Sequence, residues 1–320
     1  MVRKSSSRSN IPSLARRAGR DIKRNYSIYL LFLSIFWVLF LFNYLPLVGM
    51  SVAFKDYNAF DGIFGSPWCD PWYENFKMLF SEYYIWKTIR NTLLQSGLRI
   101  LFCFPAPIIL ALMFNEIKTE WFKRTVQTIL YLPHFLSWVI LGGVFSSILA
   151  SGGETGLVNA IIIKLGGQPI GFMSDPKWYL VFLIVSDVWQ NVGFASILYL
   201  AAIVSADVSA YEAAKIDGAN RWAVMWYITL PVLIPTVVLQ LILQLAKVLN
   251  GTFGQIRQTY SPSVYEYGDI IDSYIYRTGL KSGGDYGIAS ALDFFKSVIG
   301  FVLVLTTNYV SNKISGEGIF

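Results

Sequence analysis

The sequence predicts an all-α membrane protein that crosses the bilayer with six helices and has both termini in the cytoplasm. The first observation is composition: 54% of the 320 residues are hydrophobic and 14% are charged, whereas a soluble domain carries about 25% charged residues. The second is that apolar residues fall into six long segments, and the third is that Lys and Arg gather on alternate connections. The low charge and 16% aromatic content exclude a disordered chain, and the two cysteines exclude a disulfide scaffold.

Six segments are long and apolar enough to span a bilayer as helices. About 20 apolar residues are required, because each residue advances a helix by about 1.5 Å and the hydrocarbon core is about 30 Å thick. The predicted spans cover residues 27–53, 91–114, 126–149, 179–204, 231–250 and 288–311. The first span is too long for a cleaved signal peptide, so we expect the mature chain to retain it.

Basic residues set the expected orientation in the cell membrane. Eight Lys and Arg residues precede Tyr26. We count about fourteen on the side of the membrane that would hold the amino terminus and about nine on the other side, where connections are longer. The positive-inside rule therefore predicts a basic cytoplasmic tail over residues 1–26, a transmembrane domain over 27–312, a cytoplasmic tail over 313–320 and a cytoplasmic connection over 205–230. Because the net charge of +6 comes from this clustering, no nucleic-acid partner is expected.

Four charged residues interrupt the predicted spans: Arg99, Asp187, Lys247 and Lys296. A charge at the bilayer centre costs about 2.5–3.5 kcal/mol, so each of these side chains must face protein or water. All four are therefore candidates for a transport pathway. Lys296 most simply pairs with Asp293, which lies one helical turn earlier.

The connection over residues 205–230 has the pattern of two short helices joined by a tight turn. Helix-forming residues continue to Ile216, Gly218 follows as a terminator, and a second helical stretch begins at Arg221 and ends at Tyr227. Such a unit would project from the membrane as a compact knob. An ordinary amphipathic loop is the simpler alternative, because a Glu-Ala-Ala tripeptide alone is common.

The same connection carries a longer motif with fixed spacing. It reads Glu212-Ala213-Ala214, three residues, Gly218, nine residues, Ile228, one residue and Leu230-Pro231. This motif closely resembles the signature loop of binding-protein-dependent ABC importer permeases of the maltose-permease-like, or type I, class. Similarity to the polysaccharide-type sugar permeases of that class lies in Tyr44-Leu45-Pro46, Ala53-Phe54-Lys55-Asp56-Tyr57, Phe122-Lys123-Arg124-Thr125, Tyr131-Leu132-Pro133-His134, Val264-Tyr265-Glu266 and Tyr276-Arg277-Thr278-Gly279-Leu280.

The resemblance implies a permease subunit that imports oligosaccharides delivered by an extracytoplasmic solute-binding protein. It also implies a second, similar permease and two ATPase subunits, into which the cytoplasmic coupling-helix loops insert as a ball fits a socket. ATP and Mg would belong to the ATPase subunits, because this chain contains no GxxxxGK[ST] loop. We therefore expect no cofactor and no enzymatic activity on this chain. The resemblance assigns coupling to Glu212, Ala213, Ala214, Asp217 and Gly218. Glu212 would meet basic groups of the ATPase, and the two alanines would allow close packing. Gly218 would make the turn, with Asp217 adjacent to it.

Two predicted spans carry polar residues in helical register. The stripes are Asp187, Gln190, Asn191 and Phe194 on the fourth span and Gln240, Gln244, Lys247 and Gly251 on the fifth. They either bond neighbouring helices, for about 0.6 kcal/mol per hydrogen bond, or line a sugar pathway, since amides bind hydroxyl pairs and aromatic rings stack on sugar rings. By resemblance, the expected substrate-binding or pathway residues are Gln190, Asn191, Phe194, Lys247 and Asn250, and the polar stripes add Asp187 and Gln244.

Several interpretations remain open. Lys247 either forms a structural salt bridge with Asp187 or faces an acidic sugar such as a uronate, and Arg99 could play either part. His134 is expected to be structural, because no carboxylate or second histidine lies nearby in sequence, and no metal site is predicted. The alternatives to a sugar permease are a permease for another solute and an ion-coupled secondary transporter. The latter needs paired carboxylates within the membrane, where Asp187 stands alone.

Overall fold

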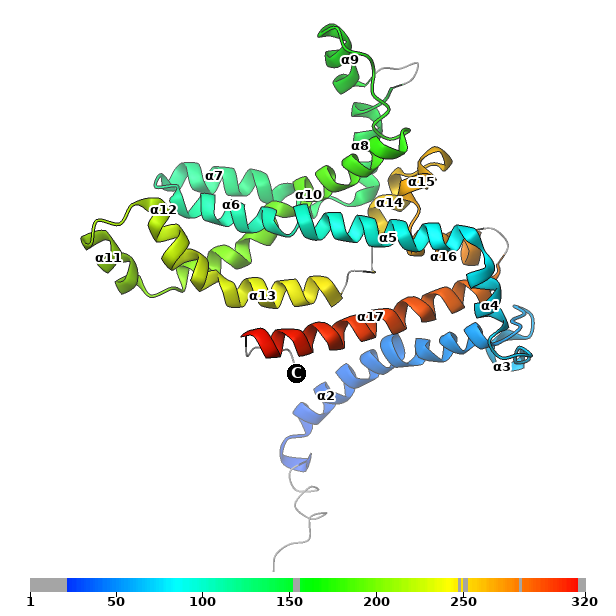
Figure 1. The fold of residues 1–320 in the computed structure, drawn as a ribbon. Coiled ribbons are helices and arrows are strands. Elements are labelled where there is room, and N and C mark those ends of the chain that lie inside the picture. The colour runs from blue at the N-terminus through cyan, green and yellow to red at the C-terminus, as the bar shows by residue number, and fades with distance from the viewer. Residues whose placement is uncertain (1–21, 152–155, 247–248, 250–252, 282–283, 316–320) are drawn as a thin grey trace, which may run out of the picture.

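The protein is helical throughout the part that the structure describes (Figure 1). This computed structural model describes residues 22–151, 156–246, 249, 253–281 and 284–315. Within these ranges, extended backbone pairs once, in an isolated antiparallel bridge between Lys55 and Trp68. The all-α prediction is therefore confirmed for the described residues. The predicted tails lie largely outside them.

Among the described residues, five helices are long and apolar enough to cross a membrane, and a sharply bent pair of helices would make six. The five helical segments are Tyr26–Phe54, Tyr83–Glu116, Pro176–Val204, Arg221–Leu245 and Tyr286–Tyr309. Each overlaps one predicted span. The second begins well before residue 91, because the polar residues that precede Asn91 are helical even though they lower the local hydropathy.

The predicted span over residues 126–149 is not one straight helix, because a sharp bend interrupts it. Helix α7 (Glu120–Tyr131) continues into a 3₁₀ turn, η3 (Leu132–Phe135), and the next helix, α8 (Trp138–Ile148), is bent from the first by 103°. Pro133 begins the turn, and Ser137 is extended and accepts a hydrogen bond from the Ile140 amide at 3.4 Å as the cap of α8. The segment is apolar throughout, but it does not form one continuous helix.

The first span combines three kinds of helix. It contains α2 (Tyr26–Leu39), a π-helical turn η1 (Phe40–Tyr44) and a 3₁₀ helix η2 (Leu45–Phe54). Pro46 lies at the start of η2 and cannot donate a backbone hydrogen bond. Buried residues occur only near the end of η2, at Val52 and Ala53, and η2 packs against α17 (Tyr286–Ser315). The first span is thus attached to the rest of the chain through its second half.

Helix α10 (Pro176–Val204) lies at the centre of the packing and contacts most of the other long helices. This helix begins at the cap Asp175, whose carboxylate accepts hydrogen bonds from the amides of Lys177 and Trp178 at 2.9 and 3.0 Å. Along its length it packs against α6 (Pro105–Glu116), which continues α5 (Tyr83–Phe102) after a short break. One apolar core joins these helices to α13 (Leu230–Ala246) through Ala111, Tyr199, Ile203 and Leu233.

Short helices occupy the connections. They are α3 (Gly62–Gly65), α4 (Glu74–Ser81), α9 (Leu157–Lys164), α11 (Val208–Ile216), α12 (Arg221–Val224), η4 (Met225–Thr229), α14 (Phe253–Thr259), η5 (Pro262–Val264), α15 (Tyr265–Gly268), α16 (Ile271–Tyr276) and η6 (Arg277–Lys281). Figure 1 shows α11 and α12 at one end of the long helices and α3, α4 and α16 at the opposite end. We call these the α11 end and the α16 end.

Candidate functional site

The predicted helix–turn–helix over residues 205–230 is present at the α11 end. The cap of α11 is Asp207, whose carboxylate accepts hydrogen bonds from the amide and the hydroxyl of Ser209 at 2.9 and 2.7 Å. These bonds lower the pKa of Asp207 below its usual value. Asn220 caps α12 in the same way by accepting from the Ala223 amide at 2.8 Å. Both helix starts are therefore fixed by local side-chain bonds.

Gly218 makes the turn that ends α11. Its φ of +76° lies in the left-handed region, which glycine adopts without a steric penalty. The amide of Ala219 donates to the carbonyl of Ala214 at 2.9 Å, and the amide of Gly218 donates to that of Lys215 at 3.3 Å. This pair of bonds is a Schellman motif, the turn that an αL glycine allows at a helix end. A glycine therefore occupies the position where the backbone needs a positive φ.

The knob, residues 208–224, presents an exposed surface. Glu212, Ala213, Asp217 and Gly218 are all exposed, and Ala214 is half-buried. One hydrogen bond, from the Tyr211 hydroxyl to the Thr229 hydroxyl at 3.3 Å, joins α11 to η4. The predicted coupling residues therefore lie together on a surface that the rest of this chain leaves accessible.

A buried ion pair joins α5 to α10 in the middle of the molecule. Arg99 Nε lies 3.8 Å from Asp187 Oδ2, and the two side chains are 9% and 11% exposed. Arg99 also donates from Nη2 to Gln255 Oε1 at 3.0 Å, which connects the pair to α14. The sequence left Lys247 and Arg99 as possible partners of Asp187, and among the described residues its cationic partner is Arg99. Lys247 and Asn250 lie outside the described residues.

Three predicted site residues on α10 hold the break between α7 and α8. Gln190 donates to the carbonyl of Leu136 at 2.9 Å, Asn191 Oδ1 lies 2.9 Å from His134 Nδ1, and Phe194 stacks on the His134 ring at 4.1 Å with the planes 2° apart. His134 was expected to be structural from its lack of sequence neighbours. In the structure it belongs to a polar network, because its partner Asn191 also donates to Asp187 Oδ1 at 2.8 Å.

Glycine contacts fix the two helices on either side of this break. A Cβ at Gly193 would collide with the carbonyl oxygen of Leu130, so α7 and α10 approach closely only because this residue is glycine. On the other side, a Cβ at Gly142 would lie 3.1 Å from the carbonyl oxygen of Gln258, where α8 meets α14. The two halves of the broken span are thus held by different elements, with His134 between them.

The polar stripes of the fourth and fifth spans meet at a cavity of about 280 Å³. Gln240 and Gln244 approach it from α13, and Phe194 from α10. The remaining lining residues are Cys103, Phe104, Pro107, Ala195, Leu198 and Tyr199. The cavity therefore brings together residues that the sequence placed on two separate stripes.

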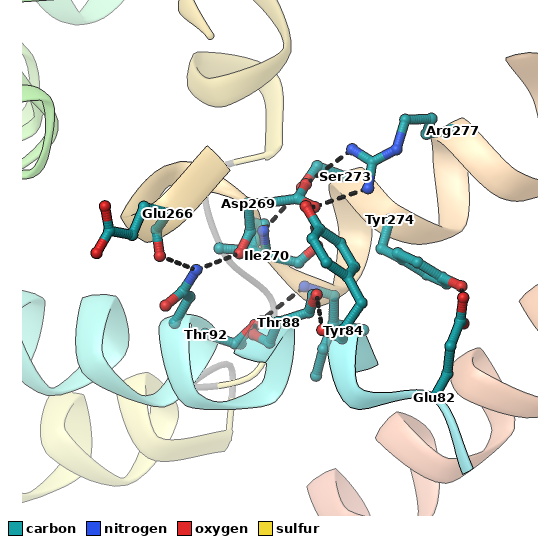
Figure 2. Close-up of polar contacts among 12 residues, drawn as sticks. Glu82, Tyr84, Thr88, Thr92, Glu266, Asp269, Ile270, Ser273, Tyr274 and Arg277 are labelled. Atoms are coloured by element: carbon teal, nitrogen blue, oxygen red, sulfur yellow. Dashed lines mark hydrogen bonds and ion pairs between the residues drawn. The ribbon is translucent and has the colours of Figure 1, made fainter. Parts of the chain in front are cut away.

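A second polar network, which the sequence did not predict, lies at the α16 end (Figure 2). The carboxylate of Asp269 is buried and accepts hydrogen bonds from Tyr84 at 2.5 Å, Ser273 at 2.6 Å and Arg277 at 3.1 and 2.7 Å. Burial acts to lower the pKa of Arg277, but its hydrogen bonds and the charge of Asp269 raise the pKa above the usual value. The guanidinium therefore stays charged.

Aromatic rings complete this network. The Arg277 guanidinium lies 4.7, 5.6 and 5.7 Å from the ring centres of Tyr265, Tyr274 and Tyr84. Tyr274 donates to Glu82 at 2.7 Å, and burial together with this bond raises the pKa of Tyr274 to about 12. Figure 2 shows Glu82 and Tyr84 at the start of α5 facing Tyr274 of α16 and Arg277 of η6.

One polar face of α5 supports the irregular chain around α15. Asn91 donates to the carbonyls of Glu266 and Asp269 at 2.9 and 3.1 Å, Gln95 donates to that of Tyr267 at 2.7 Å, and Thr92 accepts from the Ile271 amide at 3.0 Å. These bonds satisfy backbone groups that no helix satisfies. The signal was available in the sequence, since Thr88, Asn91, Thr92, Gln95, Ser96 and Arg99 share one helical face.

Lys296 differs from its expected pairing. It bonds Asp272 of α16 at 2.5 Å rather than Asp293, because α17 packs against α16 and places that carboxylate beside it. Within the described ranges, no group of three His, Cys, Asp or Glu residues is arranged to hold a metal ion.

Comparison with known proteins identifies relatives that match almost the whole chain. A family model described as the binding-protein-dependent transport system inner membrane component matches residues 104–316. Protein LplB of Bacillus subtilis (strain 168) is 37% identical over 299 residues, which is 93% of this chain and 92% of LplB. The polygalacturonan/rhamnogalacturonan transport system permease protein YteP of the same organism is 38% identical over 299 residues, which is 93% of this chain and 91% of YteP.

Solved structures show a similar fold. A chain in the crystal structure of a bacterial ABC transporter involved in the import of the acidic polysaccharide alginate matches with a TM-score of 0.86 and 39% identity, over 93% of this chain and 99% of that chain. A bacterial alginate ABC transporter in complex with alginate pentasaccharide-bound periplasmic protein matches with a TM-score of 0.84 and 39% identity, over 94% and 99%.

Proposed function

This chain belongs to the family of binding-protein-dependent transport system inner membrane components, and we propose that it is the permease subunit of an ABC importer for acidic oligosaccharides. The observation that carries the proposal is the similarity, over 93% of the chain, to a transporter for the acidic polysaccharide alginate. The name of YteP, a polygalacturonan/rhamnogalacturonan permease, supports the same substrate class. The resulting substrate is an oligosaccharide that carries uronate groups.

The knob would couple this permease to an ATPase. Its two helices have fixed starts and a glycine turn, so the exposed Glu212 is presented on a preformed surface. A carboxylate there can pair with basic groups of a partner, and Ala213 allows its backbone to approach closely. Closure of the ATPase subunits would then move α11 and, through the bond from Tyr211 to Thr229, the start of α13. ATP and Mg belong to the ATPase subunits in this proposal.

The cavity between α6, α10 and α13 would form part of the pathway. Gln240 and Gln244 supply amides that can bind sugar hydroxyls, and Phe194 supplies an aromatic ring. Gln190 and Asn191 contribute indirectly, since their amides hold the turn at His134. Lys247 and Asn250, which follow Gln244 in the sequence, remain proposed pathway residues.

The orientation follows the distribution of basic residues. The α11 end and both termini would face the cytoplasm of an inner-membrane protein, with the basic tail of residues 1–26 against the lipid surface and the tail of residues 313–320 beside it. The α16 end would face the extracytoplasmic solute-binding protein. A second permease would pair with this chain in the bilayer, and the two subunits together would form the pathway.

Transport by the reconstituted importer tests this proposal. The chain, a second permease, the ATPase subunits and the binding protein are placed in proteoliposomes, and oligouronate uptake is measured together with ATP hydrolysis. Glu212→Ala should abolish the stimulation of ATP hydrolysis by the loaded binding protein, whereas the matched control Glu120→Ala, in an exposed pair with Arg124, should not. Uptake that persists when the ATPase is inactivated would identify an ion-coupled transporter and refute the proposal.

A further inference from the structure

We propose that Arg99 binds the carboxylate of the acidic sugar, and that it does so by exchanging Asp187 for the carboxylate of the substrate. The inference rests on the proposed function and names the specificity-determining residue of the same pathway. The sequence left this contact open to Lys247 or Arg99, and the inference assigns it to Arg99. Four features of the structure carry the inference: the geometry of the ion pair, its contrast with other buried pairs, its amide partners and its position.

The Arg99–Asp187 pair is open. Arg99 Nε lies 3.8 Å from Asp187 Oδ2, which is too long for a hydrogen bond. Among the described residues, this Nε is one of two buried side-chain nitrogen or oxygen atoms that have no hydrogen-bond partner, and the other is Oε1 of Gln95. A buried guanidinium N–H without an acceptor is destabilising, so a better-placed carboxylate would be bound in preference.

Two partly buried ion pairs among the described residues have closed geometry. Arg277 donates to both oxygens of Asp269 at 3.1 and 2.7 Å, in the bidentate geometry that fits a guanidinium to a carboxylate. Lys296 bonds Asp272 at 2.5 Å. Among the described residues, neither Arg277 nor Lys296 has a buried side-chain nitrogen that lacks a hydrogen-bond partner. The open geometry therefore distinguishes Arg99 from the cations that hold the fold.

Each ion of the open pair has an amide partner of its own. Asp187 Oδ1 accepts from Asn191 Nδ2 at 2.8 Å, and Arg99 Nη2 donates to Gln255 Oε1 at 3.0 Å. When the pair separates, neither charge is left without a hydrogen bond. An exchange of carboxylates is therefore easier here than at Asp269, whose oxygens bind Arg277 directly.

The pair lies next to the cavity. Cys103 follows Arg99 by one turn of α5, Phe194 follows Asp187 by two turns of α10, and both line the cavity of about 280 Å³. Both helices run from the α16 end toward the α11 end, so the ion pair lies on the α16 side of the cavity. An oligosaccharide that enters from the α16 end would meet Arg99 before it reaches Gln240 and Gln244. A neutral sugar would offer no carboxylate in place of Asp187.

Two variants of the complete importer in proteoliposomes distinguish exchange from a structural role. Asp187→Asn leaves the Arg99 cation available to the substrate, whereas Arg99→Gln combined with Asp187→Asn removes both charges and keeps amides in their place. If Arg99 binds the substrate, Asp187→Asn retains oligouronate uptake, and the double variant loses roughly 10- to 100-fold in kcat/KM, the factor for one hydrogen bond to a charged group. Uptake of the carboxyl-reduced, neutral oligosaccharide should not change between the two variants.

If the Arg99–Asp187 pair is only a structural salt bridge, the double variant should be more active than Asp187→Asn. Asp187→Asn would then leave an uncompensated buried cation and impair assembly, and the double variant would recover. Lys296 and Asp272, substituted in the same two ways, provide the matched control that should show this structural order. If Asp187→Asn yields no intact importer, the double variant decides alone: oligouronate uptake equal to the wild type overturns the assignment, and a loss confined to oligouronates supports it.

The two levels of the proposal fail in different ways. Wild-type vesicles that import neutral oligosaccharides but no oligouronate would refute the proposed substrate class, whatever the variants do. Wild-type vesicles that import oligouronates, together with a double variant that transports them at least as well as Asp187→Asn, would refute only the role of Arg99.

Discussion

Replacement of Asp269 by Asn should loosen the contact between α16 and α5. The Asp269 carboxylate is 1% exposed and receives hydrogen bonds from Tyr84, Ser273 and Arg277. Asparagine would leave the Arg277 guanidinium among three tyrosine rings without its anion. Breaking a buried ion pair by removing one partner costs about 3–5 kcal/mol. Because the Arg277 side chain is 21% exposed, water offsets part of this cost, and we expect the lower end, about 3 kcal/mol.

Hydrogen exchange measures this loss directly. A decrease of about 3 kcal/mol in the free energy of local opening raises the exchange rate of the amides in residues 265–276 by roughly 100-fold. Lys77→Gln is the control, because its pair with Glu74 at 3.5 Å is exposed and should change exchange by less than about threefold. An Asp269→Asn variant that exchanges no faster than this control would refute the reasoning that this ion pair holds α16 against α5.

Substitutions at three further positions test the knob and the helix break. Gly218→Pro should uncouple ATP hydrolysis from uptake, because proline cannot adopt a φ of +76°, and a normal stimulated ATPase rate would contradict this. Gly193→Val should lower the thermal midpoint by pushing α7 from α10, at a cost of about 1–3 kcal/mol, so an unchanged midpoint would be unexpected. His134→Phe keeps a ring stacked on Phe194 but loses the hydrogen bond to Asn191, so it should lower the free energy of unfolding by about 1 kcal/mol. His134→Ala loses both contacts and should lower it further. Equal thermal midpoints for the two variants would argue against a contribution from the stacking.

Local features of the fold were predictable from the sequence. Long apolar runs predicted the five membrane-spanning helices of the described chain, and Gly218 after a helix-forming run predicted the turn of the knob. Both signals depend on neighbouring residues, which is why they can be read without a structure. The break at residues 136–137 was missed because the apolar run continues through it, although Pro133 and Ser137 are both signals of a helix boundary.

Pairing between distant segments could not be predicted. Asp187 meets Arg99 of another helix, and Lys296 meets Asp272 rather than Asp293, because packing of α5 on α10 and of α16 on α17 decides these neighbours. Sequence spacing tests only contacts along one helix. The polar face of α5 was a missed signal of the local kind, since hydropathy averages hide residues such as Asn91 that recur at helical spacing.

The central claim is that this chain is the permease of an ATP-driven importer for acidic oligosaccharides. The most direct measurement is ATP hydrolysis by the reconstituted importer, with its binding protein, across a series of oligouronates and neutral oligosaccharides of equal length. The account predicts stimulation by oligouronates and little by their neutral counterparts. Stimulation by neutral sugars alone would contradict the proposed substrate, and a rate that no oligosaccharide changes would contradict the assignment to a sugar importer.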